Sequence, residues 1–75
     1  MADQTLDARG LNSPLPILKA RKALTALPVG GTLEVLATDP GAIQDFAAFS
    51  RATGHDILEQ SREGNVLRFV LRRSA

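Results

Sequence analysis

Residues 6–16 read LDARGLNSPLP and contain the first change of direction in the chain. The apolar segment Thr5–Ala8 is typical of a short strand, and Gly10 ends it because glycine favours turns. Pro14 and Pro16 follow four and six residues after Gly10. Proline is favoured in the first turn of a helix, where the N–H that it lacks has no partner. The stretch therefore predicts a strand, a turn and the start of a helix.

The helix is expected to run from Pro14 to Leu27, with Ser13 as its N-cap, because serine is among the preferred capping residues. In that arrangement the free N–H groups of Leu15 and Ile17 face the side chain at position 13. The positive end of the helix dipole points to the same place. The sequence thus predicts that residue 13 is presented at the mouth of a helix, in surroundings that favour an anion.

The apolar residues of this helix fall on one arc at about 100° per residue, which should face the core. They are Ile17, Ala20, Ala23, Leu24 and Leu27. Leu15 and Leu18 lie outside the arc and leave two interpretations open. One of them is covered by the preceding loop, or both belong to an apolar docking patch with a basic rim. We define the docking patch as Leu15, Leu18, Lys19, Arg21 and Lys22.

The rest of the chain alternates in the same way between strand and helix patterns. Asp39-Pro40 repeats the pattern of a capping residue followed by proline. The residues of the second helix that share an arc are Ile43, Phe46, Ala47, Phe49 and Ser50. The expected elements are a strand Thr32–Thr38, a second helix from Pro40 to about Thr53 that stops at Gly54, and two strands, Asp56–Arg62 and Asn65–Arg73, joined as a hairpin.

The order β-α-β-α-β-β predicts an α+β fold, a two-layer sandwich with two helices on one face of a four-stranded mixed sheet. In the last strand Leu67, Phe69 and Leu71 alternate with Val66, Arg68, Val70 and Arg72. One sheet face is thus apolar and the other mixed, as expected when helices cover one side only. We expect a single domain over residues 1–75, since this length supports one small core.

Composition excludes several functional classes. The net charge of +1 and only three aromatic residues, all phenylalanine, argue against nucleic-acid binding. The chain has no cysteine and one histidine, so neither a metal site nor a cofactor is expected. No apolar run approaches the ~20 residues of a membrane span, and the N-terminus lacks the pattern of a signal peptide. A cytoplasmic protein is the resulting expectation.

Ser13 has little support as the nucleophile of a hydrolase. Such a serine needs a base, and His55 is the one candidate of that type. No G-x-S-x-G motif surrounds Ser13. A histidine just past a helix end is more simply explained by the favourable helix dipole. Asp7 and Arg9 flank the turn and either pair with each other or brace the loop.

The stretch 6–20, LDARGLNSPLPILKA, closely resembles the signature of the TusA family of sulfur carriers. That family has the motif Cys-Pro-x-Pro at the start of its first helix, after Asp-x-x-Gly. The likeness continues at Gly30-Gly31, at Asp39-Pro40 and at Gly54-His55, and so covers nearly the whole chain. The residues of this chain that match the motif around the cysteine and are expected to support it are Asp7, Arg9, Gly10, Pro14 and Pro16.

The resemblance implies a small cytoplasmic protein that holds sulfane sulfur as a persulfide on the motif cysteine. The sulfur comes from a cysteine desulfurase or a rhodanese-like enzyme and passes to acceptor proteins for tRNA thiolation, sulfur oxidation or cofactor synthesis. Neither nucleic acid nor membrane is an expected partner. A monomer is expected, with a weak dimer through the open sheet face left open. The docking patch is the expected surface for binding partners.

The chain departs from the family at the position of the cysteine, which is occupied by Ser13. A serine oxygen neither accepts nor releases sulfane sulfur, so this chain is expected to be an inactive form of a sulfur carrier. Either serine was introduced in place of a natural cysteine, or a natural relative has lost the chemistry. A cysteine here is expected to have a lowered pKa. The alternative function is a binding or regulatory module that uses the Leu15, Leu18 and Lys22 surface without chemistry.

Overall fold

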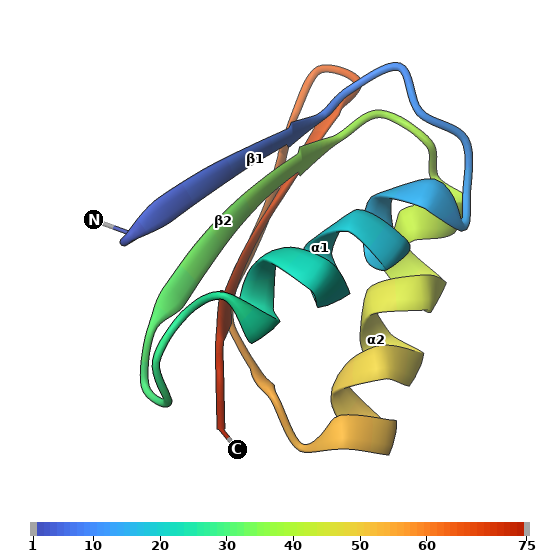
Figure 1. Cartoon of the computed structure of the whole chain (residues 1–75). Helices are drawn as coiled ribbons and strands as arrows, with labels where there is room; N and C mark the ends of the chain where they lie inside the picture. The colour runs from blue at the N-terminus through green and yellow to red at the C-terminus, as the bar shows by residue number, and fades with distance from the viewer. Residues whose placement is uncertain (1, 75) are drawn as a thin grey trace.

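Four strands and two helices follow one another in the computed structural model, which describes residues 2–74. The elements are β1 (Gln4–Ala8), α1 (Leu15–Thr25), β2 (Thr32–Ala37), α2 (Gly41–Thr53), β3 (Asp56–Glu63) and β4 (Val66–Arg72). The predicted order and the α+β sandwich are confirmed. Both helices lie on one side of the sheet (Figure 1).

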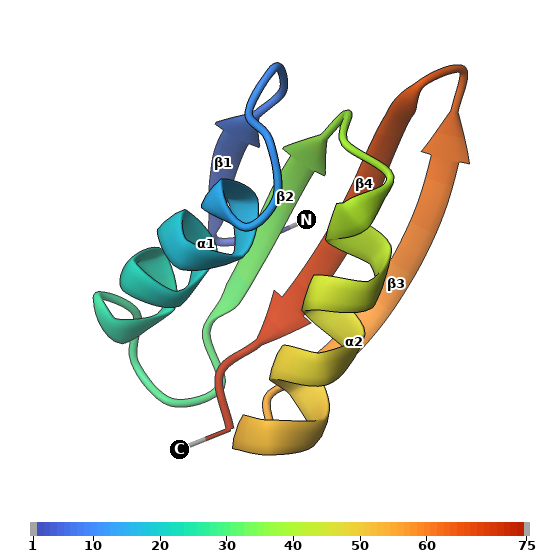
Figure 2. The same ribbon diagram turned by 90° about the vertical axis from the view of Figure 1, so that its right-hand side faces the viewer.

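The sheet has the strand order β1-β2-β4-β3. β1 and β2 are parallel, with Leu6 opposite Val35, whereas β4 is antiparallel to both β2 and β3. The two parallel strands each lead into a helix at their carboxyl ends. Both helices consequently begin at the same end of the sheet, α1 over β1 and β2, and α2 over β4 and β3 (Figure 2).

The core lies between the helices and the covered face of the sheet. The rings of Phe46 on α2 and Phe69 on β4 stack with centroids 4.4 Å apart. The alternation that the sequence shows in β2 and β4 predicts the sheet side of this core correctly. The buried residues of this core are Ala8, Ala20, Leu24, Leu33, Val35, Ala37, Ala42, Phe46, Leu67, Phe69 and Leu71. Val70 is also buried, but it lies with Arg68 on the other face of β4.

Two details of the predicted helices are wrong. α1 begins at Leu15, one residue later than expected, and its last helical residue is Thr25. In α2 the fully buried residues are Ala42 and Phe46, while Ile43 is 38% exposed. The reason is that the axis of α2 is set by the stacking of Phe46 on Phe69, which turns Ala42 rather than Ile43 toward the sheet.

The uncovered face of the sheet carries ion pairs. Arg68 on β4 pairs with Glu34 on β2 and, at 3.1 Å, with Glu59 on β3. The pKa of Glu34 is lowered, mainly by its hydrogen bond to Arg68. Arg72 pairs with Asp56 at 2.5 Å. These arginines are matched by carboxylates, as expected for charged residues on a solvated face of a sheet.

Arg73 ties the end of the chain to the end of α1. Its guanidinium donates to the carbonyl oxygens of Leu24, Thr25 and Leu27. These carbonyls lie at the C-terminus of α1 and just beyond it, where a positive charge is favoured. Within residues 2–74, no helix is long and apolar enough to span a membrane.

Candidate functional site

Ser13 lies where the starts of the two helices meet. Its backbone N–H donates to Asp39 Oδ2 at 2.6 Å, and the other oxygen of Asp39 accepts the N–H of Gly41 at 2.9 Å. These bonds favour the charged carboxylate, and the one to Ser13 is the larger cause that lowers the pKa of Asp39. Asp39 therefore joins the loop before α1 to the first residue of α2.

The hydroxyl of Ser13 points toward α2 and not outward. Ser13 Oγ donates to Asp45 Oδ2, and the residue is half-buried. The side chain at position 13 is therefore held against α2. The cause is tertiary, because a charged acceptor on α2 forms a stronger hydrogen bond than a neutral one.

Gly41 allows this close approach of the two segments. A Cβ atom placed on Gly41 would lie 2.9 Å from Ser13 Cβ and 3.2 Å from Ser13 Oγ. A Cβ contact under 3.0 Å is essentially never seen, and one of 3.2 Å is tighter than nine in ten Cβ contacts. The glycine at the start of α2 is therefore what lets residue 13 sit against that helix.

The predicted capping by Ser13 is also wrong. Pro14 is the N-cap of α1, no side chain caps the helix, and Pro16 is at one of its first positions. The N–H of Leu15 donates to the carbonyl oxygen of Asn12 at 2.8 Å, so it does not face the side chain at position 13. The peptide bond between Ser13 and Pro14 is cis. Of the two N–H groups that were expected to face residue 13, those of Leu15 and Ile17, the N–H of Leu15 therefore does not.

The two motif prolines have different surroundings. Pro16 is among the fully buried side chains, whereas Pro14 is exposed. Pro16 thus contributes to the core as well as fixing the backbone at the start of α1.

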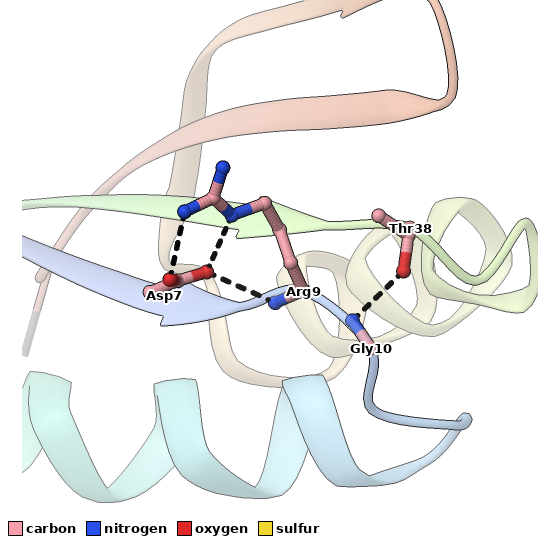
Figure 3. Close-up of polar contacts among 4 residues, drawn as sticks. All are labelled: Asp7, Arg9, Gly10 and Thr38. Atoms are coloured by element: carbon pink, nitrogen blue, oxygen red, sulfur yellow. Dashed lines mark hydrogen bonds and ion pairs between the residues drawn. The ribbon is translucent and has the colours of Figure 1, made fainter.

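Asp7 and Arg9 form an ion pair beside the turn. Arg9 Nε lies 2.8 Å from Asp7 Oδ1 and Nη2 lies 2.9 Å from Oδ2, and the Arg9 N–H also donates to Oδ1 (Figure 3). The hydrogen bonds from the Arg9 side chain and backbone lower the pKa of Asp7 to about 2. Gly10, with φ of 82°, donates its N–H to Thr38 Oγ1 at 2.9 Å. Hydrogen bonds therefore stabilise the turn internally and connect it to Thr38, the residue that follows β2.

The docking patch is uncovered. Leu15 is 44% and Leu18 53% exposed, so the preceding loop does not cover either of them. The three basic residues are exposed as well, and Lys19 and Lys22 border a hollow beside Leu6. Among residues 2–74, none of the three forms an ion pair or a hydrogen bond with residue 13.

His55 has no part in this site. It lies after the C-terminus of α2, whereas Ser13 is at the N-terminus of that helix. Its Nδ1 accepts the N–H of Ser74 at 3.0 Å, and its ring lies against Phe49. Within the described residues, no group of three His, Asp or Glu side chains is placed to hold a metal ion.

The two carboxylates that contact residue 13 are not predicted by the sequence. The pattern around Asp39 predicts only a helix cap, and Asp45 lies in no recognised motif. The sequence does contain a signal for this contact, namely two segments in which a strand is followed by a loop, a proline and a helix. If the two strands are parallel, their carboxyl ends and the helix starts that follow them lie at the same edge of the sheet. That signal depends on β1 pairing with β2, which the order of elements alone does not specify.

The fold matches that of a solved SirA-like protein from Desulfitobacterium hafniense. The TM-score is 0.82 at 26% sequence identity, over 96% of this chain and 99% of that one. The fold and the proline-flanked residue at the helix junction thus define a small two-layer protein of the SirA-like class.

Sequence comparison identifies the family. The model described as Sulfurtransferase TusA matches residues 4–73. The sulfur carrier protein TusA of Allochromatium vinosum is 50% identical over 96% of this chain and 95% of its own length. The putative sulfur carrier protein YrkI of Bacillus subtilis is 47% identical over 96% of each chain. The chain belongs to the TusA family of sulfur carrier proteins, and it contains no cysteine.

Proposed function

We propose that this chain is the serine form of a sulfur carrier, whose cysteine counterpart accepts sulfane sulfur as a persulfide at position 13 and passes it on. The donor is a cysteine desulfurase or a rhodanese-like enzyme, and acceptors include proteins of tRNA thiolation or sulfur oxidation. With Ser13 the chain retains the fold and the partner surface but not the sulfur chemistry. The proposed unit is one domain, and the proposed location is the cytoplasm.

One observation carries this proposal. Residue 13 precedes Pro14 and Pro16 and is held at the junction of the two helices by Asp39 and Asp45. Family membership supports assigning the sulfur to this position, because the chain retains the prolines of the motif and only the sulfur atom is missing. A supporting role for Asp7, Arg9 and Gly10 is consistent with their hydrogen bonds, which stabilise the turn that leads to residue 13.

The test is the substitution Ser13→Cys, which introduces a single thiol into a chain that has none. The variant is mixed with a cysteine desulfurase and its substrate cysteine, or with a rhodanese-like enzyme and its sulfur donor, and its mass is measured. We expect Ser13→Cys to gain one sulfur atom and the unsubstituted chain to gain none.

Ser61→Cys is the matched control, because Ser61 is an exposed serine on β3. Its thiol is accessible but is not at a helix junction, so enzymatic loading should be much slower. If Ser13→Cys stays unmodified with both kinds of donor, or loads no faster than Ser61→Cys, the carrier proposal fails.

A second candidate is a binding or regulatory module that works without chemistry. The exposure of Leu15 and Leu18 favours it, because a small apolar patch with basic neighbours is typical of a partner surface. Binding of the serine chain to a cysteine desulfurase is the direct measurement. Leu18→Ser should weaken it, whereas Leu58→Ser, at a leucine 45% exposed on β3, should not. Equal affinities of the two variants would exclude the patch as the docking surface.

A further inference from the structure

Asp45 is placed to act on the chemistry of residue 13. Its Oδ2 accepts the hydroxyl of Ser13, so the carboxylate contacts the very atom that sulfur replaces in a cysteine. Among residues 2–74, no basic side chain forms an ion pair with Asp45. The negative charge beside residue 13 is therefore not offset by a paired cation.

We propose that Asp45 raises the pKa of the thiol at position 13 and thereby keeps the carrier that has given up its sulfur in a protonated, weakly nucleophilic form. This inference rests on the proposed function, because it concerns the form of the chain that carries a cysteine. It reverses the expectation from the sequence that the surroundings of residue 13 favour an anion.

The physical reason is twofold. A carboxylate accepts a hydrogen bond from the protonated group, and it repels the thiolate that deprotonation creates. An S–H is a weaker donor than a hydroxyl, but the repulsion does not depend on the hydrogen bond. The positive end of the helix dipole lowers the pKa of the thiol instead, but it is equivalent to only about half a unit charge, whereas the carboxylate of Asp45 carries a full negative charge. The carboxylate is therefore expected to dominate.

The other charged groups near the helix starts do not cancel this effect. Asp39 faces residue 13 from the connection between β2 and α2 and adds a second negative charge. The basic side chains of the neighbouring loops bond to other groups, because Arg9 pairs with Asp7 and Arg62 donates to the carbonyl oxygen of Gly64. The basic residues of α1, which are Lys19, Arg21 and Lys22, are on its exposed surface. Both groups hydrogen-bonded to residue 13 are carboxylates.

Protonation after transfer opposes return of the sulfur, because the thiolate and not the thiol is the nucleophile. The thiolate of the acceptor attacks the outer sulfur of the persulfide, and its electron pair forms the new S–S bond. The old S–S bond breaks, and its electron pair leaves with the sulfur at position 13 as a thiolate. The outer sulfur keeps its proton, so no oxidant or reductant is consumed. The new thiolate lies against Asp45 and takes a proton from water, and the resulting thiol does not attack the persulfide of the acceptor.

The first test measures the pKa of the thiol in Ser13→Cys and in Ser13→Cys/Asp45→Asn, from the pH dependence of alkylation by iodoacetamide. Removal of the neighbouring charge should lower the pKa of the thiol by about one unit. At a pH below the pKa of the thiol in both variants, the Asp45→Asn variant should then contain about tenfold more thiolate. Ser13→Cys/Asp56→Asn is the control, because it removes one carboxylate charge at the opposite end of α2. An unchanged or raised pKa in the Asp45 variant overturns the proposal.

The second test compares the rates at which the same variants take up sulfur from inorganic polysulfide. The rate is measured against pH, so the ionisation of the polysulfide is common to all variants. In the Asp45→Asn variant, the rise of the rate toward alkaline pH should begin about one pH unit lower. Coincident profiles overturn the proposal, since a purely structural role of Asp45 would change the rate without moving the profile.

These measurements are independent of the proposed partners. A failure of Ser13→Cys to take sulfur from a desulfurase would remove the proposed function, but both variants could still be compared for thiol pKa. If Asp45→Asn prevents cooperative unfolding in urea, Asp45→Ser replaces it with another neutral side chain, and the same pKa shift is expected.

Discussion

The backbone N–H of Ser13 and the carboxylate of Asp39 lie 2.6 Å apart, although 26 positions separate them in the chain. Asp39 also holds Gly41, and the Ser13 hydroxyl reaches Asp45 on the same helix. The loop before α1 is thus attached to the start of α2 by side chains, and residue 13 belongs to both helix starts. Four predictions follow from this arrangement and from the packing that supports it.

Asp39 should make stability sensitive to acid. Its pKa in the folded chain is below the ordinary value of 3.8, because the carboxylate accepts the N–H groups of Ser13 and Gly41. A depressed pKa contributes stability that is complete above the ordinary value and is lost as the pH falls through the folded value. The midpoint of urea unfolding should therefore fall on acidification below about pH 4. In Asp39→Asn the fall should be shallower. Equal slopes would contradict this assignment.

Gly41→Ala should destabilise the fold by about 1–3 kcal/mol, since the new methyl group meets Ser13 Cβ at 2.9 Å. The free energy of unfolding in urea measures the loss. Ser13→Gly removes the atoms that the methyl group meets, so Gly41→Ala should cost less in the Ser13→Gly chain. An equal cost in both chains would show that the contact with Ser13 is not the cause.

The Asp7 carboxyl should titrate near pH 2, because Arg9 stabilises its charged form with side-chain and backbone hydrogen bonds. An NMR titration of the carboxyl carbon measures this value. Arg9→Gln removes the charge and most of the side-chain bonding, so the pKa should return toward 3.8. The stability that the pair supplies is present above the ordinary value and lost between about 4 and 2 as the pH falls. A value near 3.8 in the unsubstituted chain would exclude the ion pair in solution.

Phe46→Ala should cost about 3–5 kcal/mol, because the ring is fully buried and stacks on Phe69 across the two layers. The measurement is again urea unfolding. Phe49→Ala on the same helix is the control, since Phe49 is only half-buried, and its cost should be clearly smaller. Similar losses in the two variants would contradict the placement of the core.

Most of the architecture could be predicted from local patterns. The alternation in residues 66–72, the glycine at position 54 with φ of 80°, and the prolines at 14 and 40 each report on a few neighbouring residues. These signals depend on backbone sterics and on a two-sided sheet, which act the same way in any chain. They could not fix the rotation of α2, because the exposure of Ile43 depends on how Phe46 packs against β4.

The candidate site divides in the same way. The motif around residue 13, the family and the absence of a cysteine can be read from the sequence, because they depend only on which residues are present. The side chain of Ser13 was expected to face the donors of its own helix, and it instead donates to Asp45. Only the parallel pairing of β1 and β2, which brings both helix starts to one edge, places two carboxylates against that residue. Contacts between positions far apart in the chain leave no local sequence pattern, because they form only when strand pairing brings the two segments together.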